Sequence, residues 1–291
     1  MEIVYFNGKY IPGEDVCISP EDRGFLFAEG IYEVVRWYNG FFYDMDGHVD
    51  RMKRSLGEIK VRWSGEDSFP VIARELVKQN NLVGSEALVY LQVTRGAARR
   101  THSFPSPEVE PTVYAFARSF VPENQGRETG IGLMLTEDIR WSRCDIKSVA
   151  LLPNTLAYQE ALDNGFQECV FKRNGLITEC SHSNIFFVIN GILFTHPESQ
   201  FILSGITRKG IIRIARKNGI PVKEEAVGED ILDSVQEAFI TNTSGEVTPV
   251  IRINDRTVGN GVPGPVTRII REKFLDQICS IKHSGIAEAG T

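Results

Sequence analysis

Four Asn-Gly dipeptides, each flanked by short runs rich in apolar residues, constrain the fold of this chain most strongly. They are Asn7-Gly8, Asn39-Gly40, Asn174-Gly175 and Asn190-Gly191. Asn-Gly is a preferred pair for two-residue β-hairpin turns because both residues readily adopt positive φ. Each pair therefore predicts two antiparallel strands joined by a tight turn, and such pairs occur in both halves of the chain.

Segments with helical spacing of apolar residues separate these hairpins. Helices are predicted over 46–60, 69–80, 156–162, 207–218 and 264–281. Apolar runs outside the hairpins predict further strands at 87–93, 113–120 and 131–135. Hairpins with interspersed helices indicate an α+β fold, since an alternating βαβ chain would need a long crossover after each strand.

The segment 121–130, VPENQGRETG, has the composition of a linker, being polar and containing Pro and Gly. A chain of 291 residues is long enough for two medium domains. We therefore predict a small N-terminal α/β domain over 1–120, an interdomain linker over 121–130 and a larger C-terminal domain over 131–291.

Charge and motif content exclude several classes of function. The net charge of -6 disfavours nucleic acid as the main partner, because phosphate backbones repel an acidic chain. No apolar run approaches the roughly 18 residues of a membrane span, and the first residues lack the pattern of a signal peptide, so we expect a cytoplasmic protein. The five cysteines form no CxxC and the five histidines no HExxH, so no metal site is predicted. No GxGxxG follows a strand and no P-loop is present.

One short stretch, 138–148, concentrates two arginines, two aspartates and Lys147 around a tryptophan. A surface loop with a solvated lysine is the common explanation for such a stretch. The alternative is a lysine that its neighbours keep reactive, because Schiff-base chemistry needs an unprotonated amine. The stretch by itself leaves both interpretations open.

Strand alternation over 31–38 places Tyr32, Val34, Arg36 and Tyr38 on one face. These side chains could line a polar pocket, although the pattern alone favours an amphipathic strand with a solvated face.

Two predicted helix starts carry residues suited to anions. Arg51 lies one turn after His48 near the start of 46–60, where an anion would be favoured, although a salt bridge is commoner. Thr207 opens the helix after Gly205, and 241–245 follows a strand and is equally rich in small donors. Free N–H groups and hydroxyls of this kind can hold a phosphate, yet a plain N-cap explains Thr207 equally well.

Together these stretches resemble the class IV (fold type IV) pyridoxal-phosphate aminotransferases, over nearly the whole chain and most closely in the D-amino-acid transaminase branch. The resemblance rests on EDRG at 21–24, GIYEVV at 30–35, HVDR at 48–51, QVTRG at 92–96, RTHSFP at 100–105, EDIRWSRCDIKS at 137–148, RNGLITE at 173–179, GITR at 205–208 and EVTPV at 246–250. It implies the two-domain α+β fold of that family, with a pyridoxal-phosphate-binding C-terminal domain. It also implies exchange of amino groups between D-amino acids, such as D-alanine or D-glutamate, and 2-oxo acids, such as pyruvate or 2-oxoglutarate.

The resemblance implies pyridoxal 5'-phosphate as cofactor and assigns side chains to it. Lys147 matches the Schiff-base lysine, which also carries the proton from the substrate Cα, and Glu179 matches the carboxylate beside the pyridine nitrogen. Arg51 matches the phosphate-binding arginine. Five further residues match contacts to the cofactor: Leu203 on the ring, and Ile206, Thr207, Asn242 and Thr243 on the phosphate.

The resemblance also assigns the substrate pocket. Arg100 and His102 match the pair that holds the substrate α-carboxylate, on a loop that in the family enters the partner's active site, which implies a homodimer. Tyr32 matches a pocket tyrosine, and Val34 lies on the same strand face. The alternative interpretation of Arg99, Arg100 and His102 is a mobile basic loop without a binding role.

Three residues depart from the branch pattern. Arg36 stands where a lysine is usual, and His182 stands where small residues and serine are usual. Asn242 replaces a serine, which is tolerable if the backbone makes the phosphate contact. The first two departures place substrate range and rate in question rather than the type of reaction.

Rival functions remain within and outside the enzyme class. An L-branched-chain aminotransferase, an (R)-amine transaminase and an aminodeoxychorismate lyase belong to the same family, and a catalytically inactive homologue would only bind a ligand. Retention of Lys147, Glu179 and Arg51 argues against the inactive homologue.

Overall fold

The computed structural model describes residues 2–288 of the chain, with side chains described through Lys282. The chain divides into two compact units. Within the described residues, unit 1 consists of 2–121, Ile146–Ala150 and 281–288, and unit 2 consists of Pro122–Asp145 and Leu151–Ser280. The short segment Ile146–Ala150 therefore belongs to unit 1, although the residues before and after it in the sequence belong to unit 2.

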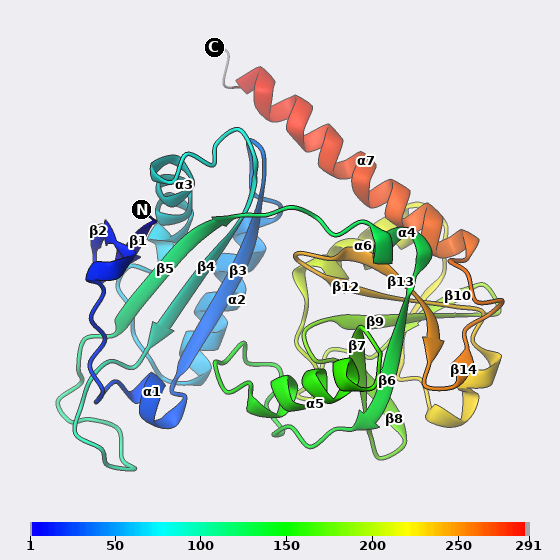
Figure 1. The fold of residues 1–291 in the computed structure, drawn as a ribbon, viewed down its shortest axis with the longest axis horizontal. Coiled ribbons are helices and arrows are strands. Elements are labelled where there is room, and N and C mark those ends of the chain that lie inside the picture. The colour runs from blue at the N-terminus through cyan, green and yellow to red at the C-terminus, as the bar shows by residue number, and fades with distance from the viewer. Residues whose placement is uncertain (1, 289–291) are drawn as a thin grey trace. The chain divides into compact units, whose positions relative to one another are not determined.

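Unit 1 contains an antiparallel five-stranded sheet in the order β2-β1-β5-β4-β3. Its strands are β1 (Ile3–Phe6), β2 (Lys9–Pro12), β3 (Gly30–Tyr38), β4 (Glu86–Thr94) and β5 (Thr112–Ser119). Its helices are η1 (Gly13–Asp15), α1 (Arg23–Phe27), α2 (Met45–Glu58), η2 (Glu66–Ser68) and α3 (Phe69–Gln79). The apolar faces of α2 and α3 pack on the sheet and form the core of the unit (Figure 1).

Unit 2 is built on a mixed sheet in the order β11-β10-β9-β12-β13-β6-β7-β8, with β14 paired to β13. The strands are β6 (Ile131–Glu137), β7 (Glu168–Arg173), β8 (Leu176–Cys180), β9 (Asn184–Ile189), β10 (Ile192–Thr195), β11 (Val222–Glu224), β12 (Glu237–Asn242), β13 (Glu246–Ile253) and β14 (Arg256–Thr257). The helices are α4 (Gln125–Thr129), α5 (Leu152–Asp163), α6 (Ile206–Lys217), η3 (Glu229–Ser234) and α7 (Pro265–Glu288), of which residues 281–288 are assigned to unit 1. Strands β6, β7, β8, β9, β12 and β13 contribute apolar side chains to its core.

Three of the four Asn-Gly pairs form the predicted hairpins, each joining two strands. Asn7-Gly8 joins β1 to β2, Asn174-Gly175 joins β7 to β8, and Asn190-Gly191 joins β9 to β10. In each pair both residues have positive φ, as a turn matched to the strand twist requires.

At Asn39-Gly40 the predicted tight turn forms, since the backbone N–H of Tyr38 donates to the Phe41 carbonyl at 2.8 Å and both turn residues have positive φ, but the predicted second strand does not form. After β3 the chain makes a single isolated bridge between Trp37 and Phe42 and then enters α2. The ring of Phe42 packs edge-on against Trp37 at 5.0 Å and is part of the unit 1 core. The pairing therefore ends after one bridge, where the apolar pattern predicts a second strand.

The segment 121–130, which its composition assigns to a linker, contains the short helix α4. Arg127 of this helix is buried and forms an ion pair with Glu246 at 3.1 Å. The segment predicted to be a linker therefore contributes a buried, paired arginine to the packing of unit 2.

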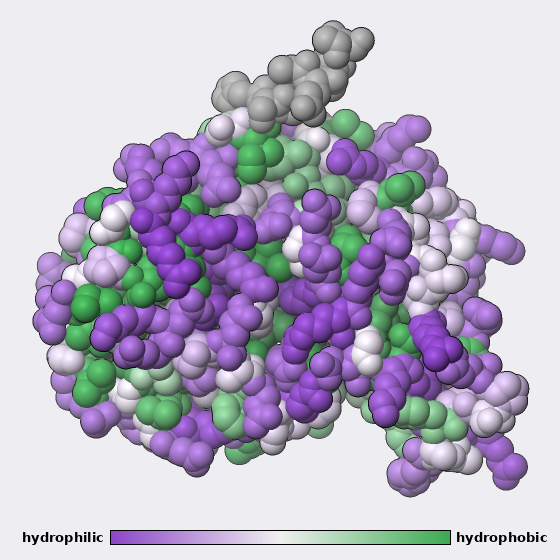
Figure 2. All heavy atoms as spheres, turned by 180° about the vertical axis from the view of Figure 1, so that it is seen from behind, coloured by the Kyte–Doolittle hydropathy of each residue, from purple (hydrophilic) through white to green (hydrophobic). Residues whose placement is uncertain are grey.

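The surface of the molecule is mainly hydrophilic on the face that Figure 2 shows, with hydrophobic residues emerging in patches. Individual large apolar side chains are exposed, among them Phe25 and Leu152. Within the described residues, no helix has both the length and the apolar character needed to cross a bilayer.

Candidate active site

The residues predicted for the site are divided between the two units. Unit 1 holds Tyr32, Val34, Arg36, Arg51, Arg100, His102 and Lys147. Unit 2 holds Glu179, His182, Leu203, Ile206, Thr207, Asn242 and Thr243.

Lys147 lies in unit 1 because its segment pairs with the first half of β3. The backbone N–H of Tyr32 donates to the Lys147 carbonyl at 3.0 Å, and Ser148 bridges Ile31. The half-buried Lys147 side chain places Nζ 4.1 Å from the centroid of the Tyr32 ring. Strand pairing thus brings together two predicted site residues that are far apart in the sequence.

A buried cluster joins β3 to α2 beside this lysine. Glu33 is fully buried and accepts from Arg51 through both carboxylate oxygens, at 2.7 Å from Nε and 2.8 Å from Nη2. His48 Nδ1 lies 2.8 Å from Glu33 Oε2. Burial by itself opposes ionisation of Glu33, but Arg51 and His48 outweigh it and hold the pKa of this carboxyl well below its usual value. Burial lowers the pKa of His48.

Glu33 therefore orients the guanidinium of Arg51, the residue predicted to bind phosphate. Strand alternation places Glu33 on the same face as the apolar Ile31 and Val35. A charged residue on an otherwise apolar strand face is the sequence feature that could have identified Glu33 as a site residue.

The other residues predicted on this strand face differ in their surroundings. Tyr32 and Val34 are half-buried, and the Tyr32 ring stacks on Tyr90 at 5.6 Å. Arg36 is almost fully buried, pairs with Glu86 at 2.9 Å from Nε, and lies over the Tyr38 ring at 4.3 Å. The sequence pattern favoured a solvated face for this strand, but at Arg36 that face is buried.

Arg100 and His102 lie together on the exposed loop between β4 and β5. The Arg100 guanidinium is 5.0 Å from the centroid of the Phe27 ring, and the His102 ring meets the same phenyl edge-on at 5.7 Å. The structure thus brings this predicted pair onto one aromatic side chain of α1.

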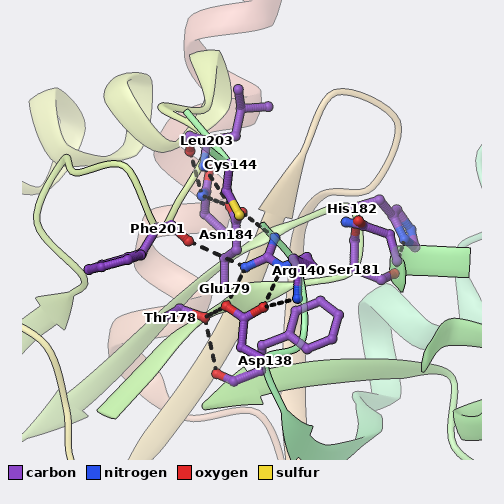
Figure 3. A network of polar contacts seen from close by, with 12 residues as sticks. Asp138, Arg140, Cys144, Thr178, Glu179, Ser181, His182, Asn184, Phe201 and Leu203 are labelled. Carbon is purple, nitrogen blue, oxygen red and sulfur yellow. Dashed lines mark hydrogen bonds and ion pairs between the residues drawn. The ribbon is translucent and has the colours of Figure 1, made fainter. Parts of the chain in front are cut away.

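In unit 2, Glu179 is buried at the centre of a polar network that Figure 3 shows. Its Oε1 accepts from Arg140 Nη1 at 2.6 Å, and Arg140 also binds Asp138 at 2.9 Å from Nε. Burial raises the pKa of Glu179 to about 7, although Arg140 acts in the opposite direction. A carboxyl with this pKa can exchange a proton near neutral pH.

The second oxygen of Glu179 connects it to Leu203. Oε2 accepts from the backbone N–H of Leu203 at 3.0 Å and from Asn184 Nδ2 at 3.1 Å (Figure 3). Asn184 Nδ2 also donates to the Leu203 carbonyl at 2.8 Å. Arg140 and Asn184 are not among the residues that the sequence predicted for the site. Arg140 lies within the charged stretch 138–148, whereas Asn184 had no distinguishing sequence signal.

The N-terminus of α6 contributes backbone donors to unit 2. Gly205 is the N-cap and has no side chain to accept from the first N–H groups, and the buried Ile206 and Thr207 follow it. An ideal Cβ at Gly205 would lie 2.1 Å from Asn184 Oδ1. Only glycine therefore fits between the helix and the residue that holds Glu179.

The β12–β13 turn supplies further donors. Asn242 Nδ2 donates to Ser183 Oγ at 2.8 Å, while its Oδ1 accepts from Ser244 Oγ at 3.1 Å and from the N–H of Gly245. The Asn242 side chain thus shapes the turn that carries Thr243. Helix N–H groups and hydroxyls are donor types that suit a phosphate, and the oriented guanidinium of Arg51 in unit 1 is a donor of the same kind.

His182 is half exposed and is held by Glu168. Its Nδ1 lies 2.8 Å from Glu168 Oε2, and its ring meets Tyr158 edge-on at 5.2 Å. Ser181 Oγ is also 2.8 Å from the same Nδ1. The unusual histidine is therefore part of an ordered polar group, not an isolated side chain.

Comparison with known proteins gives consistent results. The family model for amino-transferase class IV matches residues 30–253. A D-alanine aminotransferase from Staphylococcus haemolyticus is 42% identical over 276 residues, covering 94% of this chain and 97% of its own length. One from Bacillus licheniformis is 36% identical over 278 residues, with 95% and 97% covered. The crystal structure of the Escherichia coli branched-chain amino acid aminotransferase superposes with a TM-score of 0.87 at 26% identity, covering 94% of each chain.

Proposed function

Because this chain belongs to the class IV aminotransferases, we propose that it is a pyridoxal-phosphate-dependent D-amino-acid transaminase. It exchanges amino groups between D-amino acids, such as D-alanine or D-glutamate, and 2-oxo acids, such as pyruvate or 2-oxoglutarate. The observation that carries this proposal is the identity of 42% over nearly the whole chain to a D-alanine aminotransferase.

Pyridoxal phosphate, when bound, supplies an electron sink for the substrate Cα. Lys147 would hold the cofactor through its amine and move the proton at the substrate Cα, with the Tyr32 ring 4.1 Å away limiting the positions of Nζ. Glu179 would face the ring nitrogen. Its pKa of about 7 lets it share a proton with that nitrogen, while Arg140 fixes its orientation.

The phosphate would be bound by donors of several kinds. Arg51 offers a guanidinium that Glu33 has already oriented. Ile206 and Asn242 offer backbone N–H groups, and Thr207 and Thr243 offer hydroxyls, with Leu203 packing on the ring. The Glu179–Leu203 hydrogen bond of 3.0 Å supports this last assignment because it joins the ring contact to the nitrogen partner.

Arg100 and His102 would bind the substrate carboxylate, since a guanidinium can grip a carboxylate through two parallel hydrogen bonds. Tyr32, Val34, Arg36 and His182 would line the rest of the pocket. Lys147 reaches the substrate Cα from one side only. The position of the carboxylate anchor therefore decides which enantiomer points its Cα–H at the amine.

A homodimer in the cytoplasm is the form we propose for the active enzyme, with Arg100 and His102 entering the active site of the partner subunit. The exposure of both side chains on the β4–β5 loop supports this arrangement, because they are free of the core of their own unit.

The experiment that tests the function compares amino donors on the purified holoenzyme. Rates with D-alanine and D-glutamate should exceed those with L-leucine and L-glutamate, with pyruvate or 2-oxoglutarate as acceptor. The rival is an L-branched-chain aminotransferase, which the superposition on the Escherichia coli enzyme favours. Faster turnover of L-leucine than of D-alanine would replace our proposal with that one.

A further inference from the structure

Phe27, at the end of α1, contacts three basic side chains. The guanidinium of Arg23 lies 4.6 Å from its ring centroid and that of Arg100 lies 5.0 Å away, while the His102 ring is at 5.7 Å. Arg23 is completely buried, Phe27 is half-buried, and Arg100 and His102 are exposed. The exposed Arg100 and His102 therefore contact the Phe27 ring, which in turn packs against the buried Arg23.

Arg23 connects that interior to the loop directly. Its Nε and Nη2 donate to the two carboxylate oxygens of Glu29, at 2.8 and 2.7 Å. Its Nη1 donates to the carbonyl of Thr101 at 2.9 Å. Thr101 is the residue between Arg100 and His102, so the rigid guanidinium fork fixes the backbone at the point from which both side chains project.

The same carboxylate holds the start of the loop. Arg95 Nε donates to Glu29 Oε2 at 2.5 Å, and its backbone N–H donates to the Glu29 carbonyl at 2.9 Å. The backbone N–H of Arg23 donates to the Gly96 carbonyl at 2.9 Å. Glu29 thus connects two points of the β4–β5 loop. It binds Arg95 at the beginning of the loop directly, and it reaches Thr101, beside Arg100 and His102, through Arg23.

Two glycines permit this close approach. An ideal Cβ at Gly24 would lie 2.3 Å from Thr94 Cγ2, and one at Gly96 would lie 2.0 Å from the Glu110 carbonyl. The sequence patterns EDRG and QVTRG therefore correspond to one interlocked structure, made by α1 and the two ends of the loop.

We propose that Arg23 and Phe27 are positioning residues that pre-organise Arg100 and His102 for the substrate carboxylate. This inference rests on the proposed function, which assigns the carboxylate to that pair. An aromatic face attracts a guanidinium, and ordering two exposed side chains before binding reduces the entropy lost when the substrate arrives. Removing the ring should therefore weaken carboxylate binding without changing the chemical step.

The test replaces the ring while keeping apolar volume. In the holoenzyme, Phe27→Leu should raise KM for D-alanine about threefold to tenfold, the scale of one cation–π contact, and leave kcat within about twofold. The dissociation constant of acetate, titrated through the absorbance of the bound cofactor, should rise by a similar factor. Phe27→Tyr keeps the ring and should behave as the parent.

Phe25→Leu is the matched control. Phe25 lies on the same short helix, but its side chain is 77% exposed, so its replacement should alter neither constant. Phe27→Met provides a second ring-free variant if Phe27→Leu does not fold, and thermal melting of each variant identifies such a failure.

A double-mutant cycle with Arg100→Ala separates positioning from general structural damage. If Phe27 acts through Arg100, adding Phe27→Leu to Arg100→Ala should raise KM much less than it does in the parent. Additive effects, or a parental KM in Phe27→Leu, overturn the inference while leaving the carboxylate anchor in place. A parental KM in Arg100→Ala overturns the anchor itself, and with it both the assignment under the proposed function and this inference.

Discussion

At the scale of single residues, the site depends on charges that are buried and paired. Glu33 holds Arg51 and His48 beneath the sheet of unit 1, and Arg140 holds Glu179 in unit 2. Paired charges of this kind add little net stability, but removing one partner leaves the other unsatisfied in a medium of low polarity. Their use here is to keep functional side chains in one orientation.

Glu33→Gln should lower the free energy of unfolding by about 3–5 kcal/mol at pH 7, because it leaves Arg51 without its buried carboxylate. The pKa of Glu33 is lowered from a usual value of 4.5, so its contribution to stability is present above about pH 4.5 and is lost as the pH falls below it. Urea unfolding of parent and variant between pH 3 and 8 measures this. The gap between the two curves should narrow as the pH falls from 4.5 to 3, and a gap that stays constant down to pH 3 would contradict the pairing.

Lys147→Ala should lower the rate of transamination by at least about a thousandfold, because it removes both the amine that holds the cofactor and the proton carrier. The visible absorbance of the bound cofactor should change with it. Lys223→Ala is the control, since Lys223 is a half-exposed lysine of β11 that pairs with Glu225 at 3.8 Å. Retention of parental activity by Lys147→Ala would mean that another residue carries the proton.

At the scale of elements, the N-terminus of α6 and the Glu179 network form one packed group. Gly205 begins the helix, and Asn184 of β9 lies against it while binding both Glu179 and Leu203. A substitution at the start of α6 should therefore displace the carboxyl of Glu179 as well as the proposed phosphate donors.

Gly205→Ala should weaken retention of pyridoxal phosphate and cost about 1–3 kcal/mol of stability, because the added methyl would lie 2.1 Å from Asn184 Oδ1. Dialysis followed by absorbance measures the cofactor retained. Gly57→Ala on α2 is the control: a Cβ there meets no described heavy atom within 4 Å, so that variant should gain up to about 1 kcal/mol. Equal cofactor retention by the two variants would refute the coupling between helix and network.

At the scale of the whole molecule, the proposed dimer makes a prediction that a monomer does not. If Arg100 enters the partner's site, each active site uses Lys147 from one subunit and Arg100 from the other. Mixing and re-associating Lys147→Ala and Arg100→Ala subunits should then restore sites in which both residues are present. Activity at low D-alanine should rise well above that of either variant alone, with light scattering confirming the dimer. No rise on subunit exchange would place Arg100 in its own subunit's site.

The sequence by itself determined the local elements and the family. The turns at Asn7, Asn174 and Asn190 were predictable because positive φ is a property of the dipeptide, and α2, α3 and α6 because helical periodicity is read within a few turns. The motif set pointed to the class IV aminotransferases, which the family match confirms. The roles of the individual site residues stay predictions.

Only the tertiary structure decided which of these residues meet. Strand pairing carried Ile146–Ala150 to β3, burial of a whole strand face selected Glu33 as the partner of Arg51, and Asn184 reached Glu179. The turn at Asn39-Gly40 is followed by a single bridge at Phe42 and not by the second strand that the apolar pattern predicted. Each of these outcomes depends on contacts between residues distant in sequence and on the exclusion of water around them. Neither composition nor local spacing encodes those contacts, so they are visible only once the chain is folded.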